Sequence, residues 1–234
     1  MSSSTETKNS HHRRIRSFVL RTGRQTAAQR RALDKLWPNF GLNIDNQTID
    51  LTTQFGRAAP VVMEIGFGNG ENIAAMAIAA PEKSFLGIEV HEPGVGHCLL
   101  QIEQHNISNI RLIRHDAVEV LETSIANSSL DRVNLFFPDP WHKKRHNKRR
   151  IVQRNFVQLL AQKLRLGGIF HVVTDWPDYA EHIAEVMSNS PEFIALPEAP
   201  QDRTITRFDT RGSNLGHSNW ERAWCTRSKL PITP

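Results

Sequence analysis

Residues 137–150 combine a group that could carry out chemistry with groups that could hold a charged substrate. A preceding apolar stretch predicts a buried strand, and the chain then reaches Asp139, a carboxylate fixed between Pro138 and Pro140. Six lysines and arginines follow within residues 143–150, and so many like charges repel one another unless a polyanion neutralises them. We expect a catalytic or base-reading acid beside a surface that binds phosphates. A turn followed by a solvated basic helix would also explain the pattern.

A glycine-rich turn follows the first predicted strand and opens a predicted helix. Its spacing is G-x-G-x-G, formed by Gly66, Gly68 and Gly70. A pyrophosphate fingerprint has the spacing G-x-G-x-x-G, and Glu71 stands where its third glycine would fall. Carboxylates on both sides of the glycines, with Glu64 before them, suit a sulfonium or ammonium group better than a diphosphate. The turn therefore favours S-adenosylmethionine over a dinucleotide, although a purely structural turn is the alternative.

Further carboxylates follow the next predicted strands. Glu89 closes the second strand, about twenty residues after the glycines, where it could accept hydrogen bonds from both ribose hydroxyls. Asp116 follows the third strand, where it could accept a hydrogen bond from an adenine amino group beside the backbone of Ala117. Each acid alone is more simply a solvated strand-end residue or a helix cap. Together, acids at four successive strand ends predict a nucleoside-cofactor site.

A second group of residues could contact a substrate base. Asp175 follows the fifth predicted strand, and a carboxylate there could accept hydrogen bonds from N1 and N2 of guanine. Phe208 or Trp141 could stack on a base released from its helix, although core packing explains such aromatic residues equally well. His142 and His146 are spaced like metal ligands on a helix, but their cationic neighbours and the lack of a third ligand argue against a metal.

The elements that must position these groups alternate between strand and helix patterns. Strands are predicted at residues 61–65, 85–90, 110–115, 133–137 and 169–174, and helices at residues 72–80, 96–105, 117–125 and 151–166 and from Pro177. Two further strand candidates, 205–210 and 220–226, lie near the end of the chain. Five strand–helix units followed by an antiparallel strand pair predict an α/β fold, a doubly wound, mostly parallel sheet of seven strands with helices on both faces.

The composition limits the class of protein. A chain of 234 residues, 39% hydrophobic with five tryptophans, suits one α/β domain with extensions, and its formal charge of +5 argues for an acidic partner. Cys98 and Cys225 are the only cysteines, which excludes a disulfide framework. No apolar run reaches membrane-spanning length and the first residues are polar, so we expect a soluble, cytoplasmic protein.

Residues 1–30 are predicted to form a basic, largely disordered arm. Residues 7–33 contain no acid, while eight lysines and arginines accumulate there. The arm could lie on phosphates or serve as a solubilising tail. Thr26 and Gln29 predict a capping box that opens a short helix, which Pro38 is expected to end.

The chain resembles the bacterial tRNA (guanine-N7-)-methyltransferases, a family with the class I S-adenosylmethionine-dependent, Rossmann-like fold. The similarity extends from residue 16 to residue 224, and the run Phe-Pro-Asp-Pro-Trp-His-Lys is far more discriminating than the glycine turn. The segments that carry the resemblance are residues 64–70, 93–96, 137–150, 206–209, 211–212 and 215–217. Asn69, Lys144 and Asp209 are each one choice among those that the family tolerates.

The resemblance implies that residues 31–234 form a single methyltransferase domain, which methylates N7 of a guanine in the tRNA variable loop, at position 46. The implied cofactor contacts come from Glu64, Gly66, Gly68, Gly70, Glu89, Asp116, Ala117 and Asp139, with Asp139 as the catalytic candidate. The implied substrate contacts come from Lys143, Asp175, Thr206, Arg207, Phe208 and Asp209. The implied RNA contacts come from Arg145, His146, Asn147, Lys148, Arg149 and Arg150, and no metal is expected.

Two other interpretations of the sequence remain. An amino-methyltransferase acting on adenine N6 or cytosine N4 would have an Asp/Asn-Pro-Pro-aromatic strand end, but here Trp141 stands in place of the second proline. A non-catalytic RNA-binding protein could have kept a cofactor fold. Intact acids at every expected strand end argue against this second alternative.

Overall fold

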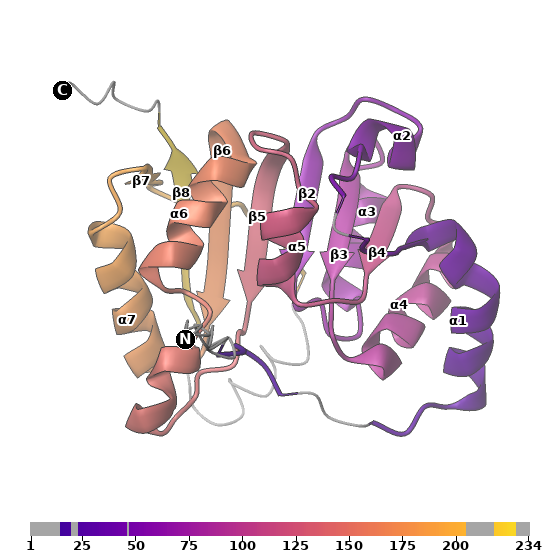
Figure 1. Cartoon of the computed structure of the whole chain (residues 1–234), viewed down its shortest axis with the longest axis horizontal. Helices are drawn as coiled ribbons and strands as arrows, with labels where there is room; N and C mark the ends of the chain where they lie inside the picture. The colour runs from indigo at the N-terminus through magenta and orange to yellow at the C-terminus, as the bar shows by residue number, and fades with distance from the viewer. Residues whose placement is uncertain (1–14, 20–22, 46, 205–217, 228–234) are drawn as a thin grey trace, which may run out of the picture.

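The computed structural model describes residues 15–19, 23–45, 47–204 and 218–227 (Figure 1). Within them, eight strands form one sheet in the order β1-β4-β3-β2-β5-β6-β8-β7. The strands are β1 (Gly41–Leu42), β2 (Val61–Ile65), β3 (Ser84–Ile88), β4 (Ile110–Ile113), β5 (Leu130–Phe136), β6 (Leu164–Thr174), β7 (Phe193–Ala195) and β8 (Trp220–Thr226). Strands β1 to β6 pair in parallel, and β8 runs antiparallel to β6 and β7. The predicted fold class is confirmed.

Helices cover both faces of this sheet (Figure 1). They are α1 (Ala27–Phe40), α2 (Leu51–Phe55), α3 (Glu71–Ala79), α4 (Glu92–His105), α5 (Ala117–Thr123), the 3₁₀ helix η1 (Lys144–Arg149), α6 (Arg154–Lys163) and α7 (Pro177–Ser188). Alternate residues of β2 enter two separate cores: Met63 and Ile65 pack with α5, α6 and α7, whereas Val62 packs with α1, α3 and α4. The two cores therefore lie on opposite faces, as a doubly wound sheet requires.

The strands differ from the prediction at the edges of the sheet. The two-residue β1 and the three-residue β7 were not predicted, because strands so short show no alternation of apolar residues. The strand candidate at residues 205–210 lies outside the described residues. Among the described strands, the antiparallel neighbours of β8 are β6 and β7. Strand β6 begins at Leu164, so the prediction of a helix over residues 151–166 was too long at both ends.

Helix α1 begins with the predicted capping box. The backbone N–H of Gln29 donates to Thr26 Oγ1 (3.2 Å), and the Thr26 N–H donates to Gln29 Oε1 (2.8 Å). The prediction that Pro38 ends the helix was wrong, because Pro38 lies inside α1, which ends at Phe40. The boundary predicted at residue 30 stays a prediction. No helix in the described part of the chain combines the length and apolar character needed to cross a membrane.

Candidate functional site

A cavity of about 380 Å³ opens where the carboxyl ends of the central parallel strands meet. Gly66, Glu89, Ala117 and Asp139 are among the residues that line it, and they follow β2, β3, β4 and β5 respectively. The volume is typical of a small-molecule site. Parallel topology thus brings together groups that are far apart in the sequence, and their contact with a cofactor stays a prediction.

The glycine turn leaves open space beside the cavity. Gly66, Gly68 and Gly70 all have positive φ angles, of 73°, 58° and 81°, which side chains rarely adopt. A Cβ atom at Gly66 or Gly68 would meet nothing within 4 Å, whereas one at Gly70 would lie 2.4 Å from Cys98 Sγ. The first two glycines therefore leave room for a ligand to approach the backbone, and Gly70 allows α3 to pack against α4.

Glu89 holds the turn in place from the neighbouring strand. Its carboxylate accepts hydrogen bonds from three backbone N–H groups, those of Gly68 (2.9 Å), Val90 (2.7 Å) and His91 (2.9 Å). An ionised carboxylate offers about four acceptor positions. Glu89 can therefore fix the glycine turn and still accept a hydrogen bond from a ribose hydroxyl.

Glu64 lies behind the turn and not among the residues that line the cavity. It is 4% exposed, and its Oε2 accepts a hydrogen bond of 2.6 Å from Asn72 Nδ2. Burial raises the pKa of Glu64 to about 7, although the Asn72 bond and the charge of Arg132 act in the opposite direction. The cofactor contact of Glu64 stays a prediction, and the described contacts give it a supporting role.

Replacing Glu64 with glutamine should remove a pH dependence of stability. The pKa of this group rises from an ordinary 4.5 to about 7 on folding, so between these values the folded state binds a proton that the unfolded state lacks. The free energy of unfolding therefore increases as pH falls through this window, by on the order of 3 kcal/mol. Urea unfolding should show that Glu64→Gln stabilises the protein more at about pH 8 than at about pH 5.

Glu103 supplies the control for this measurement. Its bond to Arg31, with a further bond to Lys35, lowers the pKa of Glu103 to about 2, so it remains ionised across the same pH window. Glu103→Gln should therefore change stability equally at both pH values. If Glu64→Gln behaved in the same way as Glu103→Gln, a raised pKa of Glu64 would be contradicted.

Asp116 caps a helix and also faces a neighbouring hollow. Its Oδ1 accepts a hydrogen bond of 2.9 Å from the backbone N–H of Val118, at the start of α5. The residue also lines a cavity of about 330 Å³ together with Phe18 and Arg114. The helix-cap interpretation therefore holds for this acid, and its contact with an adenine stays a prediction.

The loop that carries Asp139 has an unusual backbone. Phe137 and Trp141, which flank the Pro138-Asp139-Pro140 sequence, have φ angles of +49° and +50°. Bulky side chains rarely adopt this conformation, which is found where the surrounding structure enforces it. Asp139 is thus presented by a constrained loop.

Arg150 is one of the groups that hold this loop. Its Nε donates to the carbonyl of Pro140 (2.9 Å), its guanidinium also bonds to the carboxylate of Asp178, and it lies 4.8 Å from the centre of the Tyr179 ring. The residue is only 3% exposed. The RNA contact of Arg150 stays a prediction, and the described contacts give it a structural role, in which it joins the Asp139 loop to α7.

The predicted substrate residues are only partly described. Asp175 directly follows β6, and its neighbour Trp176 makes an edge-to-face contact with His142, with ring centres 4.2 Å apart. This contact joins the loops that carry Asp139 and Asp175. Lys143 is exposed at the start of η1. The other predicted substrate residues lie outside the described residues: Thr206, Arg207, Phe208 and Asp209.

Helix η1 presents a basic surface beside the cavity. Lys144, Arg145 and Lys148 are exposed, and His146 and Asn147 are partly so. The pKa of His146 is lowered, first by loss of solvent and then by the surrounding cations. Among the described residues, no three His, Cys, Asp or Glu side chains gather as metal ligands.

Sequence reasoning missed the part of the N-terminal segment that borders the cavity. Ser17, Phe18 and Val19 line it. The carbonyl of Ser17 accepts a hydrogen bond from Trp141 Nε1 (3.1 Å), and Arg149 donates to the carbonyls of Arg16 and Phe18 (3.0 Å each). The signals of this contact were the apolar run Phe18-Val19-Leu20 within a basic arm and the start of the family resemblance at residue 16.

Comparisons with known proteins agree on the fold and the family. A family model described as a putative methyltransferase matches residues 58–222. The solved structure of the 16S rRNA methyltransferase KamB is similar with a TM-score of 0.57 at 13% identity, covering 81% of this chain and 98% of that one. A 16S rRNA adenine-N1 methyltransferase from Catenulisporales acidiphilia, solved with S-adenosylmethionine, is similar with a TM-score of 0.53 at 14% identity. This match covers 82% of this chain and 95% of that one.

Two curated relatives are much more similar in sequence. The tRNA (guanine-N7-)-methyltransferase of Shewanella amazonensis is 54% identical over 215 residues, which cover 89% of this chain and 90% of the relative. The protein of the same name from Photorhabdus laumondii is 53% identical over 215 residues, which again cover 89% of this chain and 90% of the relative. Such identity over nearly the whole length extends well beyond the glycine turn. The chain therefore belongs to the bacterial tRNA (guanine-N7-)-methyltransferase family.

Proposed function

We propose that this protein transfers the methyl group of S-adenosylmethionine to N7 of a guanine in the variable loop of tRNA, at position 46, and that it acts in the cytoplasm. The observation that carries the proposal is the cavity at the sheet edge, which Gly66, Glu89 and Asp139 line together. The exposed cations of η1 follow directly on the Asp139 loop. A small-molecule site beside a basic surface suits a nucleoside cofactor and a polyanionic substrate.

The residues of the cavity fit S-adenosylmethionine. The open space at Gly66 and Gly68 admits a ligand to the backbone, and Glu89 keeps an acceptor for a ribose hydroxyl. Asp116 and the backbone of Ala117 would hold the adenine. When bound, S-adenosylmethionine supplies a methyl group on a positively charged sulfur.

The target atom determines what the protein must do. Guanine N7 has an in-plane lone pair and no proton to lose, so a strong general base is unnecessary. The protein must hold N7 in line with the methyl group and its leaving sulfur, at near attack distance. We assign Asp139 to orienting the base and to stabilising the positive charge that develops on the purine. Asp175 and Asp209 would hold the Watson–Crick edge, with Lys143 and residues 206–208 as further contacts.

Nucleoside analysis tests this function directly. Purified protein is incubated with bulk tRNA and S-adenosylmethionine carrying a labelled methyl group, and the labelled nucleoside is identified. We expect 7-methylguanosine, which makes the chain cleavable by reduction and aniline. N6-methyladenosine would instead support the amino-methyltransferase alternative. If tRNA bound but received no label, the non-catalytic alternative would hold.

Neutralising the exposed cations of η1 should weaken tRNA binding by an ionic mechanism. Each phosphate contact that is lost should reduce the slope of log affinity against log salt by about one unit. We expect this for Arg145→Gln and Lys148→Gln, measured by titration at several salt concentrations. An unchanged slope in both variants would contradict an RNA-binding role for η1. Arg149 is less decisive because it also bonds to the carbonyls of Arg16 and Phe18.

A further inference from the structure

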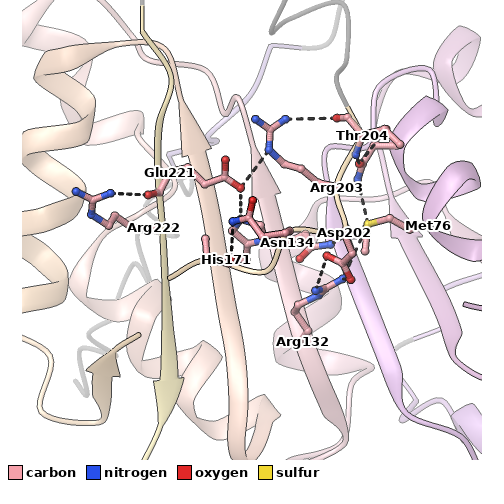
Figure 2. A network of polar contacts seen from close by, with 12 residues as sticks. Met76, Arg132, Asn134, His171, Asp202, Arg203, Thr204, Glu221 and Arg222 are labelled. Atoms are coloured by element: carbon pink, nitrogen blue, oxygen red, sulfur yellow. Dashed lines mark hydrogen bonds and ion pairs between the residues drawn. The ribbon is translucent and has the colours of Figure 1, made fainter. Parts of the chain in front are cut away.

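Three consecutive residues of the connection between β7 and β8 are each held by a different element of the fold. Residues 202–204 have no helix or strand structure of their own. Their side chains and backbone instead make polar contacts with the sheet and with α3 (Figure 2). The three pairs are Asp202 with Arg132 of β5, Arg203 with Glu221 of β8, and Thr204 with Asn72 of α3.

The first contact is a two-pronged ion pair. The terminal guanidinium nitrogens Nη1 and Nη2 of Arg132 donate to Oδ1 and Oδ2 of Asp202, at 2.9 Å each. The Arg132 side chain is 8% exposed, and that of Asp202 is 44% exposed. A buried arginine is therefore matched by a partner that comes from the connection rather than from the sheet. This geometry fixes both the position and the orientation of residue 202.

The second contact reaches the cavity. Glu221 Oε1 lies 2.7 Å from Nε2 of the fully buried His171 and accepts a hydrogen bond of 3.2 Å from Arg203 Nε (Figure 2). The Arg203 guanidinium lies 5.9 Å from the ring centres of both Phe136 and Phe137, which line the cavity. Glu221 thus holds Arg203 against the residues that lead into the Asp139 loop.

The third contact joins the connection to the region behind the glycine turn. Asn72 is 3% exposed. Its Oδ1 accepts hydrogen bonds from the backbone N–H (3.0 Å) and the hydroxyl (3.3 Å) of Thr204, while its Nδ2 donates to Glu64 (2.6 Å). The side-chain amide of Asn72 therefore bonds to Thr204 through its oxygen and to Glu64 through its nitrogen. Removing this amide would leave buried polar groups without their hydrogen bonds.

Stabilising the sheet does not by itself require these polar contacts. Apolar side chains of similar volume would stabilise the sheet as well as buried ionic and polar groups do. Polar groups, unlike apolar ones, specify which atom lies where. The network also converges on a segment that has no helix or strand structure of its own. It therefore acts on the placement of residues 202–204, beyond any contribution to stability.

We propose that Asn72 and Glu221 are positioning residues, which hold residues 202–204, the described part of the connection nearest in sequence to Thr206–Asp209, and that tRNA methylation depends on this placement. The inference rests on the proposed function, because the family resemblance assigns Thr206 to Asp209 to the substrate. Neither residue is among those that line the cavity. Their effect on catalysis passes through Arg203 and Thr204.

Kinetics of the full-length protein test this inference. The variants are Asn72→Ala and Glu221→Ala, assayed with varied tRNA at saturating S-adenosylmethionine. We expect kcat/KM for tRNA to fall by about tenfold in each, the equivalent of one lost buried hydrogen bond. The dissociation constant of S-adenosylmethionine should change less than about twofold in Glu221→Ala. Glu221→Gln keeps an acceptor oxygen for Arg203 and should recover most of the lost activity.

Asn109→Ala is the matched control. Asn109 is also a buried asparagine, and it donates to the carbonyls of Ala77, Ala80 and Lys83 without contacting residues 202–204. It should lose stability but keep kcat/KM within about twofold of the parent protein. If Asn72→Ala and Glu221→Ala performed like Asn109→Ala, the inference would be overturned. If Asn72→Ala did not fold, Glu221→Ala and its glutamine counterpart would decide alone.

This design separates two kinds of failure. If the parent protein formed no 7-methylguanosine on tRNA, the proposed function itself would fail. An active parent with variants that matched the control would overturn the positioning role and leave the proposed function intact.

Discussion

Asp139→Ala should reduce methyl transfer to background, a loss of at least about 10²- to 10³-fold in kcat. The carboxylate lines the cavity at the end of β5, so it is suited to orient the purine and to oppose the positive charge that methylation creates on it. We expect that interaction to strengthen in the transition state, so its loss should lower kcat even with both substrates saturating. Single-turnover transfer of labelled methyl groups to tRNA measures the effect.

The Asp139 variants separate charge from shape. Asp139→Asn keeps the size of the side chain and removes its charge, and it should lose nearly as much activity as Asp139→Ala if charge stabilisation dominates. Both variants should fold, as thermal unfolding would show, and should bind tRNA with nearly the parent affinity. Turnover at the parent rate in Asp139→Ala would rule out the catalytic assignment.

Arg150→Lys should lower kcat by about ten- to a hundredfold without changing the salt dependence of tRNA binding. Lysine keeps a positive charge near Asp178 but lacks the planar group that also bonds to the Pro140 carbonyl and stacks on Tyr179. The loop that carries Asp139 would then lose one of its fixed points. Steady-state kinetics and tRNA titrations at several salt concentrations test the two halves of this prediction.

Arg154→Lys provides the comparison for Arg150→Lys. Arg154, at the start of α6, also bonds to a distant segment, through Ser190 and Glu192 after α7, and these bonds do not involve the Asp139 loop. It should lose some stability and keep its kcat. If Arg150→Lys instead kept its kcat and lost about one unit of salt slope, Arg150 would be an RNA contact, as its place in the basic run first suggested.

The central sheet and the convergence at its edge were predictable because their signals are local. Short buried runs that end in glycines or acids identify parallel strands, and parallel strands place their carboxyl ends together. That rule correctly predicted that Gly66, Glu89, Ala117 and Asp139 would meet. It could not foresee the hydrogen bond between Glu64 and Asn72, because the pattern of a fully buried strand does not show which neighbours a side chain meets.

The features that sequence reasoning missed depend on contacts between distant parts of the chain. Arg150 was grouped with its basic neighbours, and its burial is explained only by Asp178 and Tyr179, almost thirty residues later. The contact of Ser17 with Trp141 spans 124 residues. Asn72 reads as an ordinary residue at the start of a helix, and only the fold brings Thr204 to it. Periodicity and composition carry no information about such pairs.

The three backbone bonds that Glu89 accepts have a consequence for ligand affinity. Because they are made entirely within the protein, they hold the glycine turn at Gly68 and the loop at Val90 and His91 without help from a ligand. A nucleoside that binds there therefore has a small free-energy cost for ordering the loop. More of its interaction energy then contributes to affinity. We therefore expect the glycine-turn side of the cavity to act as a preorganised receptor for the proposed cofactor.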